Sequence, residues 1–204
     1  MGAKGEGKEP QRRALSALLG LLRLVTGAAA AARDAGLVPC LLQLLTPPAA
    51  VQQRALAGDI LRVIGEQVEG GVLTSALVEQ HGLVELLATW QESADPAEQH
   101  LAAVLLTCMC ASPGALDAID APAKMDWVID RLTAGGGCPP ALQGAAVEAL
   151  AALMRCEAVD GTAALARLQR TEPLKALLSE ITRGGAVQAG VAVLSTLVDD
   201  PTHG

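Results

Sequence analysis

A helical pattern is clearest in residues 53–63, which read QRALAGDILRV. Apolar side chains stand three, seven and ten positions after Gln53. At about 100° per residue these positions share one face of a helix. A glutamine opens the same kind of amphipathic segment five times, at spacings of 42, 46, 44 and 45 residues. The five are Gln11, Gln53, Gln99, Gln143 and Gln188. One repeating unit therefore organises the chain.

The predicted buried face follows from aligning the five segments on their glutamines. Positions three, six, seven and ten after the glutamine are apolar in every segment, except at Asp59 and Ser195. We therefore expect these positions to face the core in each copy. A carboxylate in such a row needs a partner, and the two local candidates for Asp59 are Arg54 and Arg62.

The composition favours helices along the whole chain. Of 204 residues, 39 are Ala and 33 are Leu, and the aromatic residues are Trp90 and Trp127 alone. Ala and Leu are strong helix formers, whereas strands are rich in β-branched and aromatic residues. The sequence therefore predicts an all-α fold and excludes an all-β one.

Two shorter helical pieces separate successive long segments, with Gly, Pro or a capping residue at the breaks. Asp95, followed by Pro96 and Glu98, resembles a capping box with proline at the first helical position. Thr46 and Ser112 each precede a proline and are predicted to be N-caps. The repeating unit is therefore expected to contain three helices.

Residues 36–45, GLVPCLLQLL, resemble the second helix of an armadillo repeat, and a long third helix follows them at 51–64. Poorer copies begin at Gly82, Ala123 and Pro173. The resemblance implies a right-handed α-solenoid of armadillo-like three-helix repeats. The related HEAT repeats have two helices, and the short extra helix predicted in each unit favours the armadillo type. Those short helices are predicted at 71–80, 113–120 and 160–170.

The domain organisation expected from this resemblance is one repeat domain with short ends. A flexible head is expected at 1–9, the repeat domain at 10–199 and a tail at 200–204. Within the domain, a leading helix at 10–25 precedes four repeats. The repeats are expected at about 27–66, 70–111, 113–157 and 160–199.

Armadillo proteins often hold an extended peptide on their concave third helices with a ladder of Asn and a row of Trp. The matching Asn positions here are Gly20, Arg62, Cys108, Ala152 and Leu197. The matching Trp positions are Ser16, Gly58, Val104, Glu148 and Val193. Because the side-chain amides that would replace backbone partners are missing, clamping in the manner of nuclear-import receptors is excluded.

The expected concave wall carries arginines although the net charge of the chain is −7. One hypothesis is a groove for an acidic helix or tail, in which the arginine guanidinium groups make bidentate pairs with carboxylates of the partner. The alternative is a set of scattered, solvated arginines. Four glycines interrupt the long helices opposite the predicted core, either for close approach of a partner backbone or because the solenoid tolerates them; they are Gly20, Gly58, Gly144 and Gly190. The predicted binding residues are Arg13, Arg23, Arg62, Arg155, Glu148, Gly20, Gly58 and Cys108.

The charge and the cysteines exclude several classes of function. A net charge of −7 argues against nucleic acid or an anionic membrane surface as partner. The five cysteines form no C-x-x-C pair, so a zinc ribbon or disulfide framework is not expected, and a reducing cytoplasm fits best. Cys108 and Cys110 lie about 200° apart on a helix, which favours core packing over shared metal binding. No apolar run reaches the roughly 18 residues of a membrane span.

No catalytic residues are predicted, because no nucleophile lies near a base and no metal cluster or dinucleotide loop occurs. We therefore expect no enzyme activity, cofactor or small-molecule substrate. Two functions stay open. The first is a protein-binding scaffold, for instance within a cytoskeletal assembly. The second, implied by the family resemblance, is a co-chaperone that exchanges nucleotide or helps motor proteins fold. A permanent assembly subunit is expected to expose an apolar patch on its first or last repeat.

Overall fold

The computed structural model describes residues 8–46, 49–68, 70–133, 138–156, 166, 168, 171–184 and 186–198. These residues form helices and connecting turns, with no strand among them, so the all-α prediction is confirmed. The helices are α1 (Lys8–Leu24), α2 (Ala28–Asp34), α3 (Leu37–Leu45), α4 (Val51–Gln67), α5 (Ser75–Gln80), α6 (Leu83–Glu92), α7 (Pro96–Cys110), α8 (Pro113–Leu116), α9 (Ala121–Thr133), α10 (Pro140–Met154), α12 (Thr171–Thr182) and α13 (Val187–Val198).

The predicted helices lie within four residues of the observed ones wherever the structure describes them. The leading helix predicted at 10–25 is α1, which begins inside the expected head. The rest of that head, the tail at 200–204 and most of the helix predicted at 160–170 lie outside the described residues. No single described helix is long and apolar enough to span a membrane. α2 and α3 have the required length and apolarity only when taken together, and the chain bends by 83° between them.

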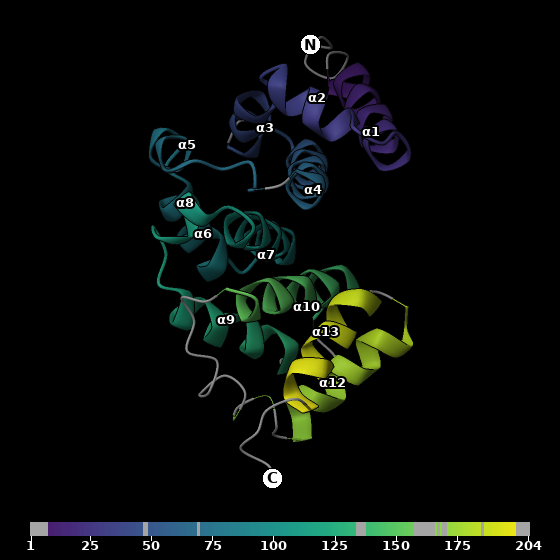
Figure 1. The fold of residues 1–204 in the computed structure, drawn as a ribbon, viewed down its shortest axis with the longest axis vertical. Helices are drawn as coiled ribbons and strands as arrows, with labels where there is room; N and C mark the ends of the chain where they lie inside the picture. Colours follow the sequence, from purple (N-terminus) through teal and green to yellow (C-terminus); the bar gives the residue numbers. More distant parts are fainter. Residues whose placement is uncertain are drawn as a thin grey trace, which may run out of the picture.

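The long helices pack on one another in chain order. α1 packs on α4, α4 on α7, α7 on α10, and α10 on α13. Three of the shorter helices pack mainly on the long helix that follows them: α3 on α4, α6 on α7 and α9 on α10. The short helix α8 packs instead on α7, which precedes it. Figure 1 shows the result, with α1 and α12 at opposite ends of the long axis. The principal contacts therefore join only neighbouring groups of helices.

Hydrogen bonds connect residues that lie about one period apart in the sequence. Gln53 Nε2 donates to Gln11 Oε1 at 2.9 Å, so two of the repeating glutamines touch. Gln67 Nε2 donates to the carbonyl oxygen of Leu22 at 3.1 Å. Both bonds join α1 to α4. Gln99 instead donates to the carbonyl oxygen of Ser93 at 2.6 Å, so among the described residues the contact between repeating glutamines is specific to the first pair.

A partly buried ion pair joins α4 to α7. The side chain of Arg54 is only 9% exposed, and its Nη1 lies 3.0 Å from Glu98 Oε1. Ser93 donates its hydroxyl to the other carboxylate oxygen at 2.8 Å. The hydrogen bonds from Ser93 and Arg54 lower the pKa of Glu98 against the effect of burial. Arg54 therefore pairs with Glu98. It is not the partner of Asp59, for which it was one of two candidates.

Of the three predicted N-cap residues, Asp95 alone caps a helix with its side chain as expected. Asp95 Oδ1 accepts from the backbone N–H of Ala97 at 2.9 Å, which confirms the N-cap of α7. Thr46 instead donates to the carbonyl oxygen of Gln43 at 3.0 Å, so it ends α3 rather than starting α4. The prediction for Thr46 was wrong because a hydroxyl can bond backward along a helix as well as forward.

Ser112 also has a role other than the predicted one. Its side chain makes no capping bond to α8. Its Oγ, fully buried, accepts from the backbone N–H groups of Val72 and Leu73 at 3.0 and 3.1 Å. One hydroxyl therefore satisfies two buried donors in the segment between α4 and α5, about 40 residues earlier in the chain.

The predicted buried face is correct in the middle of the chain and only partly correct at its two ends, since Val191 of α13, predicted to face the core, is 49% exposed. In α7 and α10 the predicted positions are all buried. In α1 the predicted Ala14, Ala17 and Leu21 are exposed, whereas Leu15 and Leu19 are buried. α1 packs mainly on α4, and no described pair of short helices covers its other side as α2 and α3 cover α4. One face of α1 therefore stays exposed.

Candidate partner-binding groove

A large groove runs across the long helices. It has a volume of about 1220 Å³ and is lined from α4, α7, α8, α10 and α13 and the residues directly after several of them. We call it the central groove. Its charged lining residues are Arg62, Glu66, Asp117, Glu148 and Arg155. Because these residues belong to helices far apart in the sequence, the groove exists only through the stacking described above.

Arg62 is held by carboxylates inside the groove. Its Nη1 lies 2.7 Å from Glu66 Oε1 and 3.5 Å from Glu148 Oε2. Burial lowers the pKa of the Arg62 guanidinium. The negative charges of Glu148, Glu66 and Asp59 together outweigh this effect, so the pKa is raised. The charge of Asp59 therefore acts on Arg62, one of its two expected partners. Burial raises the pKa of Glu148, and the charge of Arg62 opposes that shift.

The groove is mixed in charge rather than basic. Three carboxylates and two guanidinium groups line it. Arg155 is exposed, whereas Arg62 is only 17% exposed and bonded within the protein. Of the four predicted arginines, the structure thus brings Arg62 and Arg155 into one groove, together with the predicted Glu148.

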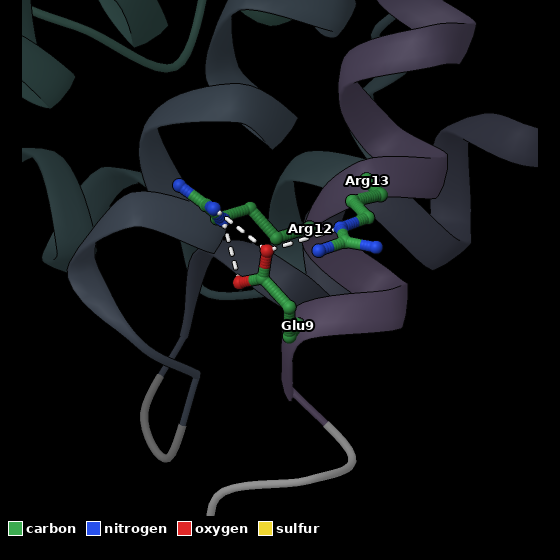
Figure 2. Close-up of polar contacts among 3 residues, drawn as sticks. All are labelled: Glu9, Arg12 and Arg13. Carbon is green, nitrogen blue, oxygen red and sulfur yellow. Dashed lines mark hydrogen bonds and ion pairs between the residues drawn. The ribbon is translucent and has the colours of Figure 1, made fainter.

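Arg13 and Arg23 do not line the central groove, since both lie on α1. Figure 2 shows Arg13 and Arg12 turned toward the carboxylate of Glu9. Arg13 Nε is 3.1 Å from Glu9 Oε1, and Arg12 reaches both carboxylate oxygens at 2.8 and 3.1 Å. The hydrogen bond from Arg12 is the main cause that lowers the pKa of Glu9. This exposed cluster organises the start of α1.

The glycines of the long helices face neighbouring helices more often than open space. A Cβ on Gly58 would lie 3.2 Å from Leu101 Cδ2, and one on Gly190 would meet the side chain of Ile181. The prediction that these glycines lie opposite the core was therefore wrong for Gly58 and Gly190, which are both buried. Gly20 has open space where its Cβ would be. Gly58 serves the close packing of α4 on α7.

Cys108 lies under the groove rather than in it. It is 2% exposed and sits beside Leu101 and Gly58 between α4 and α7. Burial raises the pKa of its thiol to about 12. The core-packing interpretation of Cys108 is confirmed, and its side chain does not reach the groove surface.

We did not predict several groove residues from the sequence, and we expected one of them, Cys110, to pack in the core. They include Glu66, Cys110, Asp117 and Cys156. Their position in the repeating segment could have identified some of them. In the second and fourth long segments, the residues twelve and thirteen positions after the repeating glutamine line the groove. Those residues are Gly65, Glu66, Arg155 and Cys156. The groove thus follows the C-terminal ends of α4, α7 and α10 and meets the N-terminal end of α13.

No protein-family model, curated protein or solved structure matches this chain. Within the described residues, no group of three or more His, Cys, Asp or Glu side chains is placed to hold a metal ion. What can be inferred about function therefore depends on the geometry of the groove.

Proposed function

We propose that this chain is a non-catalytic protein-binding scaffold, built as a right-handed armadillo-like solenoid, that holds a segment of a protein partner in the central groove. Two features support the solenoid. The long helices pack in chain order, and hydrogen bonds such as Gln53 to Gln11 join residues one period apart. A stacked array of this kind offers an extended surface as its working part.

The observation that carries the proposal is the size and lining of the groove. Its volume of about 1220 Å³ exceeds the range of roughly 300–1,000 Å³ that is usual for small-molecule pockets. Such pockets are mostly apolar, whereas five charged side chains line this groove. A helix or extended peptide, with both polar and apolar side chains, fits such a surface better than a small ligand does.

The charges indicate what the partner segment presents. Arg155 is exposed and suits an acidic side chain, in keeping with the acidic segment expected from the sequence. Glu66 and Asp117 are exposed as well and suit basic side chains. The partner is therefore proposed to carry both signs of charge, which sets its register in the groove.

Exposed apolar side chains favour a permanent assembly subunit over a co-chaperone. Leu24 is 86% exposed and Val25 50% exposed, both at the end of α1. At the other end of the stack, Leu178 of α12 and Val191 of α13 are 46% and 49% exposed. Apolar side chains exposed on the outermost helices are typical of surfaces that contact other subunits.

Reversing the exposed charge in the groove tests the proposal. We expect Arg155→Glu to lower the recovery of the partner by about tenfold in affinity purification, because an attractive contact becomes a repulsive one worth at least ~1.4 kcal/mol. The matched control is Arg33→Glu on α2, which is exposed but lies outside the groove. Partner recovery would be read by quantitative mass spectrometry, with circular dichroism to confirm equal helix content.

Equal recovery with both variants would contradict the groove as the binding site. A chain that instead accelerates nucleotide release from a 70-kDa chaperone, with no stoichiometric partner, would contradict the scaffold function and support the co-chaperone alternative.

A further inference from the structure

Two cysteines from neighbouring repeats meet in the wall of the central groove. Cys110 is the last residue of α7, and Cys156 is the second residue after the end of α10. Cys156 Sγ is 3.7 Å from the carbonyl oxygen of Cys110 and 3.2 Å from that of Ala152. Both cysteines line the groove, and both are partly exposed. Their 46-residue separation is closed by the packing of α7 on α10.

A hydrogen bond between the two thiols shifts their pKa values in opposite directions. The hydrogen bond from Cys110 lowers the pKa of Cys156 to about 7; burial opposes this, and the charge of Arg155 adds to it. The same hydrogen bond, together with burial, raises the pKa of Cys110. Cys156 is therefore the more acidic of the two thiols. Its lowered pKa favours the thiolate, which is the nucleophilic form.

The other three cysteines lack this combination. Cys108 is buried, and burial raises the pKa of its thiol. Burial likewise raises the pKa of Cys138. Cys40 is exposed on α3 and does not line the groove. Cys110 and Cys156 alone among the five combine a place in the groove with a second sulfur at hand.

We propose that Cys110 and Cys156 form a dithiol modification site that reacts with small disulfides of the glutathione type and closes an internal disulfide across the groove wall. The groove, at about 1220 Å³, has room for such a reagent. Arg155 beside the site is exposed and suits the carboxylates of glutathione.

The reaction proceeds in two exchange steps. First, the Cys156 thiolate attacks one sulfur of oxidised glutathione, which forms a mixed disulfide on Cys156 and releases one glutathione thiolate. Second, the sulfur of Cys110 attacks Cys156 Sγ and expels the second glutathione. Two cysteine thiols are oxidised to one disulfide, one glutathione disulfide is reduced to two thiols, and the two cysteine protons pass through solvent to the leaving thiolates.

Peptide mapping of the oxidised full-length chain tests this site. After treatment with oxidised glutathione at neutral pH, we expect a tryptic cross-link between the peptide that contains Cys110 and the one that begins at Cys156, with the loss of two hydrogen atoms. We expect Cys156 to react at least tenfold faster than Cys138. A wild-type chain that forms no such cross-link, or that gains only a glutathione adduct, would overturn the proposal.

Variants identify the partner sulfur, because Cys108 and Cys110 fall in the same tryptic peptide. In Cys110→Ser the cross-link should disappear and a stable glutathione adduct should remain on Cys156. The matched control, Cys108→Ala, should keep the cross-link. A cross-link that survives Cys110→Ser but is lost in Cys108→Ala would overturn the assignment. If Cys110→Ser fails to fold by circular dichroism, fragmentation of the wild-type cross-link itself places the bond at Cys108 or Cys110.

Discussion

Replacing Leu150 by Ala is expected to lower the free energy of unfolding by about 2–5 kcal/mol. Leu150 is fully buried in α10, the helix that packs on α7, α9 and α13. Removing its branched end deletes apolar contacts and leaves a cavity that close-packed neighbours fill only in part. Urea denaturation followed by circular dichroism would measure the change.

The matched control for this substitution is Leu178→Ala on α12. Leu178 is 46% exposed, so its truncation should change the free energy of unfolding by less than about 1 kcal/mol. A loss below about half a kcal/mol for Leu150→Ala would contradict the packing order of the long helices, because the side chain would then not lie between them.

Ser112→Ala is expected to cost about 2–4 kcal/mol of unfolding free energy. The substitution leaves the backbone N–H groups of Val72 and Leu73 without the hydroxyl oxygen that they share, and each buried donor left unsatisfied costs about 1–3 kcal/mol. Ala fills nearly the same space as Ser, so the effect isolates the lost hydrogen bonds. Thermal and urea unfolding would both show the loss.

Ser75→Ala provides the comparison, since Ser75 is exposed and donates to the carbonyl oxygen of Gly114 at 2.7 Å. Water can replace that bond, so a change of less than about 1 kcal/mol is expected. Equal effects of the two substitutions would show that Ser112 does not have the bridging role described here.

The helices could be predicted from the sequence because their signals are local. Gly36 and Gly82 precede α3 and α6 with φ of 79° and 55°, a left-handed backbone that glycine adopts freely. Asp95 caps α7 as expected. Hydrophobic periodicity, helix caps and glycine breaks each depend on residues only a few positions apart. They can therefore be recognised from a single sequence.

The contacts between helices far apart in the sequence could not be predicted in the same way. Ser112 precedes a proline like an N-cap, yet its hydroxyl oxygen accepts from Val72 and Leu73, about 40 residues earlier in the chain. The exposed face of α1, with Leu21 51% exposed, depends on which helices cover it and not on its own pattern. Local rules predict which residues are apolar but not which neighbour covers them.

The groove was predicted in outline and missed in its details. Arg62, Glu148 and Arg155 were identified from their positions in the repeat, and the structure brings them together. The pairing of Cys110 with Cys156 was not found, because the two residues stand at different positions after their glutamines, eleven and thirteen. Their contact depends on the exact stagger of α7 and α10, which a period of 42–46 residues does not define.

The central claim is that the helices stack in register, so that residues one period apart touch and residues two periods apart do not. Cross-linking the repeating glutamines tests it most directly, with a bismaleimide whose reach is about 10 Å, the distance between axes of packed helices. In a chain with the native cysteines replaced, Gln11→Cys with Gln53→Cys should cross-link efficiently, because the two native side chains are hydrogen bonded at 2.9 Å. Gln11→Cys with Gln99→Cys should not, since two such distances separate them. Efficient linkage of the second pair, or none of the first, would contradict the stacked arrangement.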